Sequence, residues 1–233
     1  MRTDPTRTVS HGASLRKVAR ESTASLIAAQ LRDAIMDGTL GPGSQLGETE
    51  LASQLGVSRG PLREAMQRLV QEGLLRSERN RGLFVITLTA EDVRDIYTAR
   101  AAVERAAVSL IVDGDHVAAA QRLAMVHRDM IKAANRGNRA ALSDADLRFH
   151  ETVVGLSGSP RLARMHATLI VETRICLTAL ETTPDPVAAA VNEHGELLEA
   201  IRRGDRRLLL RLIDAHMDDA VRRLTAIPAT VDA

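Results

Sequence analysis

The sequence has very few aromatic residues: one tyrosine, two phenylalanines and no tryptophan among 233 residues. Hydrophobic residues still make up 45% of the chain, an ordinary share for a globular protein, and most of them are Leu, Ala, Val and Ile. Aromatic residues favour strands, whereas Ala and Leu favour helices. This composition excludes wholesale disorder and predicts a core of packed helices rather than sheets.

Cysteine and long apolar runs are also scarce. Cys176 stands alone, which excludes a disulfide within the chain and is typical of a reducing cytoplasm. No run approaches the roughly 18 apolar residues of a membrane-spanning helix. The first twenty residues carry five basic side chains without a following apolar stretch. We therefore expect no secretory signal and a cytoplasmic protein.

An excess of charge of one sign is missing as well, with 31 Lys and Arg against 30 Asp and Glu. The charges are nevertheless uneven. Residues 1–85 hold 12 basic and 9 acidic side chains, and the remainder holds 19 and 21. A mildly basic first third on a mildly acidic body favours a head that binds a polyanion.

The apolar pattern predicts a mostly α protein with two domains. We expect a flexible basic arm at 1–21, a small domain at 22–86, a linker at 87–89, an all-helical domain at 90–227 and a tail at 228–233. Within 22–86 the order is helix, helix, tight turn, helix and hairpin. That order is the plan of a winged helix-turn-helix, a DNA-binding unit.

The third helix of this small domain carries the predicted DNA contacts. Ser58 is a good N-cap, and the helix start offers unpaired amides and a positive dipole end to phosphate. Arg59 and Arg63 are four residues apart on one face, where they can reach guanine edges or clamp the backbone. At the hairpin tip we expect DNA contacts from Arg79, Arg81 and Gly82.

Three strings in this domain carry a family resemblance: LGETELA at 46–52, LGVSRGPLREA at 55–65 and LVQEGLL at 69–75. They resemble the DNA-binding head of the GntR family of bacterial transcription regulators. The resemblance implies that Ser58, Arg59 and Arg63 touch DNA and that Gly82 belongs to the wing. Some members of that family have an arginine where this chain has Thr49.

The second domain reads as six helices with short loops and no strand signal. We expect them near 90–112, 116–136, 140–156, 160–180, 186–203 and 205–226, separated by breaks rich in Gly, Pro and Asp. Six such helices predict an antiparallel bundle. The first helix has an apolar stripe made of Val93, Ile96, Val103, Ala107 and Leu110.

Histidines on apolar helix faces give the sharpest signal. Asp146 and His150 are four residues apart, so both can reach one metal ion. His194 and His216 lie in the apolar stripes of two other helices. One aspartate and three inward histidines predict a divalent metal site, and nitrogen and oxygen ligands suit zinc, nickel or manganese.

Other histidines leave alternatives open. His127 and His166 also lie near apolar stripes, and the sequence alone does not separate them from the four ligands. His11 and His116 are expected to be solvated, and Cys176 is expected to be a small core residue.

Arg100 lies within an apolar stripe and has Glu104 four residues further on. One interpretation is a satisfied Arg100–Glu104 pair near the surface. The other is a guanidinium that points into a cavity to receive a carboxylate ligand. The spacing alone favours the pair.

The motifs of the second domain resemble the FCD ligand-binding domain of the FadR subfamily of GntR regulators. This resemblance implies a metal held by Asp146, His150, His194 and His216, and a small organic acid bound at open metal positions with Arg100 as its clamp. Other members without the metal bind a long acyl thioester, and the complete ligand set argues against that branch.

The sequence thus predicts a homodimeric, metabolite-responsive regulator, in the first place a repressor, which binds a palindromic DNA operator and is no enzyme. One alternative is a bundle-type metalloenzyme, a hydrolase. No general base stands beside the ligands, because Glu151 and Glu193 are expected to point about 100° away from His150 and His194. A second alternative is a DNA-binding protein whose metal is purely structural.

Overall fold

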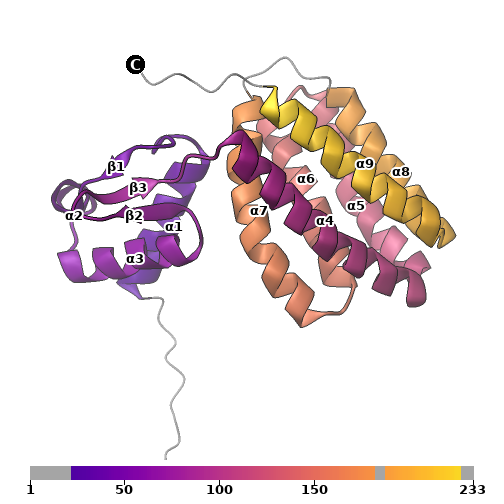
Figure 1. The fold of residues 1–233 in the computed structure, drawn as a ribbon, viewed down its shortest axis with the longest axis horizontal. Helices are drawn as coiled ribbons and strands as arrows, with labels where there is room; N and C mark the ends of the chain where they lie inside the picture. Colours follow the sequence, from indigo (N-terminus) through magenta and orange to yellow (C-terminus); the bar gives the residue numbers. More distant parts are fainter. Residues whose placement is uncertain (1–21, 182–186, 227–233) are drawn as a thin grey trace, which may run out of the picture.

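The computed structural model describes residues 22–181 and 187–226. The predicted arm, the tail and the break at 184–186 lie outside the described residues. A small mixed unit and a helical bundle lie side by side, and each has its own hydrophobic core (Figure 1). No helix in the described ranges is long and apolar enough to span a membrane. The fold class is the one predicted, a helix-turn-helix head followed by a helical domain.

The small unit, called the head below, contains three helices and a three-stranded sheet. The helices are α1 (Thr23–Met36), α2 (Glu48–Leu55) and α3 (Arg59–Gln71), and the strands are β1 (Gln45–Leu46), β2 (Leu75–Glu78) and β3 (Gly82–Val85). β2 and β3 form the predicted antiparallel hairpin, and β1 pairs with the other edge of β3. β1 was not predicted, because a strand of two residues exists only through pairing with a segment almost forty residues away.

The core of the head forms where α3 packs against α1. Leu62, Met66 and Leu69 of α3 are completely buried. A bidentate ion pair also joins the two helices: Arg32 of α1 donates from Nε and Nη2 to the carboxylate of Glu72, at 2.9 and 2.7 Å. Glu72 is the C-cap of α3, so this pair fixes the end of that helix.

Two predicted helix starts differ in how they are capped. Thr89 and Asp92 form a complete capping box at the start of the first bundle helix, as their spacing indicates. Ser58 is the N-cap of α3, but its side chain makes no capping hydrogen bond. The Ser58 hydroxyl thus remains at the exposed helix start rather than being used within the protein.

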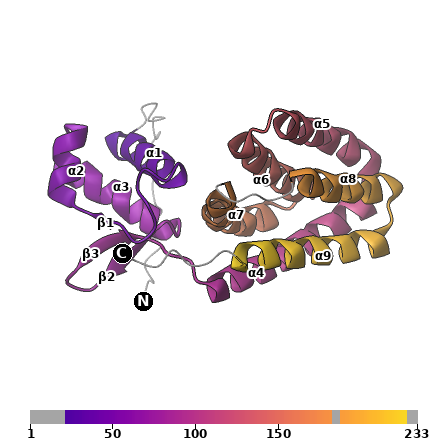
Figure 2. The same ribbon diagram turned by 90° about the horizontal axis from the view of Figure 1, so that it is seen from above.

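The bundle contains the remaining six described helices. They are α4 (Ala90–Asp113), α5 (His116–Asn135), α6 (Arg139–Leu156), α7 (Pro160–Glu181), α8 (Val187–Arg203) and α9 (Arg206–Thr225). α5 packs against α6 and α8, and α4 packs against α9 and α7. Figure 2 shows the same bundle from above. One stripe position was wrong: Leu110 is exposed, and Val108 and Ile111 take the buried positions on α4.

The head is seated against α7, the bundle helix on the side of the head in both views (Figures 1 and 2). Val171 and Ile175 of α7 pack against the hydrophobic core of the head. Between them, the Glu172 carboxylate lies against Gly73, 3.3 Å from where a Cβ of residue 73 would be. On another face of the same helix, His166, Ile170, Thr173 and Cys176 are buried.

Candidate functional site

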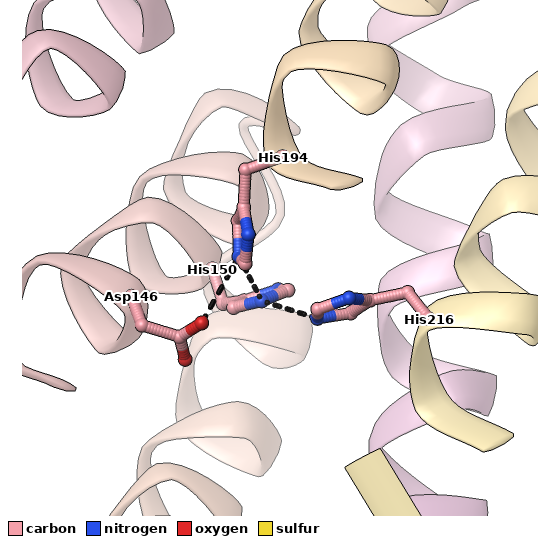
Figure 3. A group of neighbouring side chains, drawn as sticks. All are labelled: Asp146, His150, His194 and His216. Carbon is pink, nitrogen blue, oxygen red and sulfur yellow. Dashed lines mark hydrogen bonds and ion pairs between the residues drawn. The ribbon is translucent and has the colours of Figure 1, made fainter. Parts of the chain in front are cut away.

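Four potential metal ligands meet inside the bundle. Asp146 and His150 come from successive turns of α6, His194 comes from α8, and His216 comes from α9 (Figure 3). One ligand atom from each residue lies within 4.8 Å of those of the other three. The three histidines are buried, and Asp146 is partly buried. These are the four residues that the sequence singled out, and the fold brings them all together.

The imidazoles face one another through their Nε2 atoms. Nε2 of His150 lies 3.1 Å from Nε2 of His194 and 3.2 Å from Nε2 of His216. Oδ1 of Asp146 lies 3.1 Å from Nε2 of His194. Three nitrogens and one carboxylate oxygen therefore converge on one point.

The opposite nitrogen of each ring is held from outside the cluster. Nδ1 of His150 donates to Glu104 Oε2 at 2.7 Å, and Nδ1 of His216 donates to Glu193 Oε2 at 2.8 Å. Nδ1 of His194 donates to the Ala190 carbonyl at 2.7 Å. Carboxylate and carbonyl oxygens only accept, so every Nδ1 carries the hydrogen. In the neutral rings each Nε2 then presents its lone pair to the centre, the form that binds a metal.

The electrostatics favour the neutral form of two of the histidines and the charged form of Asp146. Burial, helped by the charge of Arg100, lowers the pKa of His150 to about 3. Burial also lowers the pKa of His216. Burial acts against ionisation of Asp146, but His194 outweighs it and lowers the pKa of that carboxyl. Conversely, Asp146 overcomes the effect of burial and raises the pKa of His194.

Neutral His150 and His216 thus turn two lone pairs toward each other at 3.2 Å with no hydrogen between them. Such a contact is repulsive unless a proton or a metal ion lies between the nitrogens. The residues therefore fit a divalent metal with nitrogen and oxygen ligands.

Arg100 and Glu104 lie beside this cluster and are almost completely buried, at 1% and 0% exposure. Nε of Arg100 donates to Oε1 of Glu104 at 2.7 Å. The sequence-based interpretation of a pair is right, but its position near the surface is wrong, because α4 packs against α6, α7 and α9. Burial would raise the pKa of Glu104, but His150 and Arg100 lower it well below the ordinary value. Nη2 of Arg100 is buried without a hydrogen-bond partner.

The other candidate histidines lie outside the cluster. Nε2 of His166 donates to Oε1 of Glu104 at 3.1 Å, and His127 bonds the Val191 carbonyl through Nε2 at 2.9 Å. Neither contributes an atom to the four-ligand group. His116 is not fully solvated as expected, because its ring packs against Gly204 at the turn between α8 and α9.

On the head, the predicted DNA-contact residues are all exposed. Arg59 and Arg63 project from the first two turns of α3, and Arg79, Arg81 and Gly82 lie at the β2–β3 turn. Arg59 donates to Thr49 Oγ1 at 3.2 Å, and Arg63 donates to Glu48 Oε2 at 2.7 Å. Both partners belong to α2, so the free protein holds these two guanidinium groups at the α2–α3 face. Gly82 has a φ of +104°, a backbone conformation that favours glycine.

Two protein-family models match this chain, one in the head and one in the bundle. Residues 23–85 match the model of bacterial regulatory proteins of the gntR family, and residues 95–219 match the FCD domain. The chain is a GntR-family regulator with an FCD domain. The HTH-type transcriptional regulator YdhC of Bacillus subtilis is 29% identical over 190 residues, which cover 81% of this chain and 85% of YdhC.

Two further proteins are similar to this GntR-family regulator along most of its length. The gluconate operon transcriptional repressor of Bacillus licheniformis is 28% identical, over 87% of this chain and 85% of that protein. A crystal structure of a GntR transcriptional regulator from Rhodococcus sp. RHA1 superimposes with a TM-score of 0.76 at 26% identity, over 88% of this chain and 99% of that one. The family and its members are transcriptional regulators, so the enzyme alternative falls away.

Two carboxylates of this GntR-family regulator were missed as partners of the ligands. Glu193 was expected to point away from the ligands, but its carboxylate lies beside one of them, His216 on the adjacent helix α9. Glu104 was assigned to Arg100 alone, yet it also holds His150. A search for acidic residues on apolar faces would have found Glu104, whereas nothing in the sequence pairs Glu193 with residue 216.

Proposed function

We propose that this GntR-family regulator is a metabolite-responsive repressor that senses a small carboxylate at a metal held by Asp146, His150, His194 and His216. The observation that carries the metal is the contact between the Nε2 atoms of His150 and His216, in which both hydrogens are on the far side of the rings. Zinc is the first choice, with nickel or manganese as alternatives. When bound, the cation would supply open coordination positions for an anionic ligand.

The proposed effector class follows from Arg100. Its buried Nη2 lacks a partner, and a buried guanidinium nitrogen is costly unless an acceptor reaches it. A carboxylate is the acceptor that a guanidinium fork fits best. The name of the gluconate operon repressor supports this class, since gluconate is a sugar acid.

The proposed DNA ligand is a palindromic operator bound by a homodimer in the cytoplasm, where bacterial DNA lies. Ser58, Arg59 and Arg63 would enter the major groove, and Arg79, Arg81 and Gly82 would contact the neighbouring backbone or minor groove. One recognition helix reads only a few base pairs, so two heads about a helical turn or more apart supply the missing specificity. Effector binding would favour one arrangement of the heads, with a coupling of roughly 1–3 kcal/mol.

The test begins with metal. Protein stripped by a chelator is titrated with Zn²⁺ by calorimetry, beside His194→Ala and the control His127→Ala, a histidine outside the cluster. We expect one site per chain in the wild type and the control, and loss of that site with a lower melting temperature in His194→Ala. Normal zinc binding by His194→Ala would contradict the ligand set.

The second step tests sensing. Metal-loaded and metal-free protein are screened by thermal shift against small mono- and dicarboxylates, and hits are tested for release of a duplex selected from a random library. Stabilisation by an acid only when metal is present, together with weaker DNA binding, supports the proposal. Tight metal binding with no change of DNA affinity for any hit would instead support a purely structural metal.

A further inference from the structure

The carboxylate of Glu104 is shared by three buried donors on three helices. Oε2 accepts from Nδ1 of His150 on α6, and Oε1 accepts both from Nε of Arg100 on α4 and from Nε2 of His166 on α7. The four residues are at most 2% exposed. No water competes in such a site, so a change at one donor alters what the other two receive.

His166 connects this carboxylate to the helix on which the head is seated. Five and nine residues further along α7, Val171 and Ile175 pack against the core of the head. Glu172, between them, lies against Gly73, where α3 gives way to β2. A helix over so short a distance moves as one piece, so a shift at His166 reaches the seat of the head.

Arg100 is the donor to Glu104 on which a bound effector would act. Nη2 of Arg100 has no partner, while its Nε shares Oε1 of Glu104 with His166. An anion that engaged the guanidinium would compete with Glu104 for Arg100 and leave more of Oε1 to His166. A cation held at the site would fix the ring of His150 and, through the hydrogen bond from its Nδ1, would restrain the Glu104 carboxylate.

We propose that the Glu104–His166 hydrogen bond is the link through which occupancy of the metal and effector site changes the contact between α7 and the DNA-binding head. The proposal rests on the metal site proposed above and adds the route from that site to the head. His166 is a positioning residue here, because it lies outside the ligand set.

The link is testable with Zn²⁺ alone as the probe and hydrogen exchange as the readout, in the full-length protein. We expect Zn²⁺ to change amide exchange by at least about threefold in residues 69–76, the segment around Gly73, which lies against Glu172 of α7. His166→Leu removes the donor and should abolish this change, while the protein should still bind Zn²⁺ through its four ligands. His166→Gln keeps an N–H donor and should preserve part of the change.

Two further variants keep the result interpretable. His127→Leu removes a half-buried bundle histidine that does not touch Glu104, and it should respond to Zn²⁺ as the wild type does. Val171→Ala combined with Ile175→Ala weakens the far end of the route and should blunt the response at 69–76 without loss of zinc binding. This double variant also provides the test if His166→Leu does not fold.

The outcomes separate the two proposals. Wild-type protein that binds no Zn²⁺ contradicts the metal site. Protein that binds Zn²⁺ with unchanged exchange at 69–76 overturns the link and leaves the metal site standing. The link is also wrong if His166→Leu keeps the response, or if it loses zinc binding, since His166 would then act on the metal site itself.

Discussion

The carboxylate of Glu193 accepts a hydrogen bond from Nδ1 of His216, 2.8 Å away, although Glu193 is the sequence neighbour of His194. Arg223 Nη2 lies 3.3 Å from the same oxygen. A single carboxylate on α8 therefore orients the ligand contributed by α9. Its role can be separated from that of the ligands themselves, because it contributes no atom to the four-ligand group.

We expect Glu193→Ala to weaken Zn²⁺ binding by about 10- to 100-fold, because the ring of His216 loses the partner that fixes its tautomer. Glu193→Gln should lose less, since its amide oxygen still accepts from Nδ1. Competition with a chromophoric chelator measures both. Equal zinc affinity in wild type and Glu193→Ala would show that the ring is oriented without this carboxylate.

Arg100→Lys separates charge from hydrogen-bond geometry at the effector clamp. Lysine keeps a cation beside Glu104 but loses the planar fork, so we expect effector affinity to fall about tenfold or more. Operator binding without effector should stay near that of the wild type, and zinc binding should persist. Calorimetry with the acid found by the screen measures the loss. Full effector affinity in Arg100→Lys would leave Arg100 as a partner of Glu104 alone.

On the head, Arg59→Ala and Arg63→Ala should each weaken operator binding by about tenfold, the usual cost of a lost arginine contact. Helical content by circular dichroism should not change, because both side chains are exposed. Fluorescence anisotropy with a labelled duplex provides the measurement. An unchanged affinity would remove that arginine from the interface.

Glu48→Gln should act in the opposite direction. Glu48 holds Arg63 in the free protein and carries a negative charge beside the proposed DNA face. Removing that charge frees the guanidinium, and we expect DNA affinity to rise about threefold, with most of the gain in the association rate. If Glu48→Gln binds DNA more weakly, the pair orients Arg63 for DNA rather than competing with it.

Cys176 should be unreactive in the folded protein. Burial raises the pKa of its thiol to about 12, so at pH 8 only about one molecule in ten thousand carries the reactive thiolate. Alkylation by iodoacetamide should therefore be slow in native protein from pH 7 to 9 and fast in guanidinium chloride. Rapid native labelling at pH 8 would mean that α7 opens on the timescale of the reaction.

The sequence was sufficient to place Asp146, His150, His194 and His216 on inward helix faces, because helical periodicity is local. The spacing of Asp146 and His150 puts them on one face, and apolar neighbours place His194 and His216 inside the bundle. The sequence could not separate His127 and His166 from the ligands. Periodicity predicts that a residue faces inward, but it does not predict which inward residues contact one another.

The residues around the ligands depend on packing between helices far apart in sequence. Glu104 meets His150 and His166 only because α4 lies beside both α6 and α7. Register between neighbouring helices likewise decides that Glu193 reaches His216. The same holds for β1, whose two residues become a strand only through β3.

The bidentate pair of Arg32 and Glu72 bears on how the head would bind DNA. It ties the end of α3 to α1, so the recognition helix already has its orientation in the free protein. Association then immobilises side chains, at about 0.5–1.5 kcal/mol for each flexible one, and does not have to order a helix. The slope of operator affinity against salt concentration should therefore be set almost entirely by the number of phosphates that the protein neutralises. A small heat-capacity change should accompany binding.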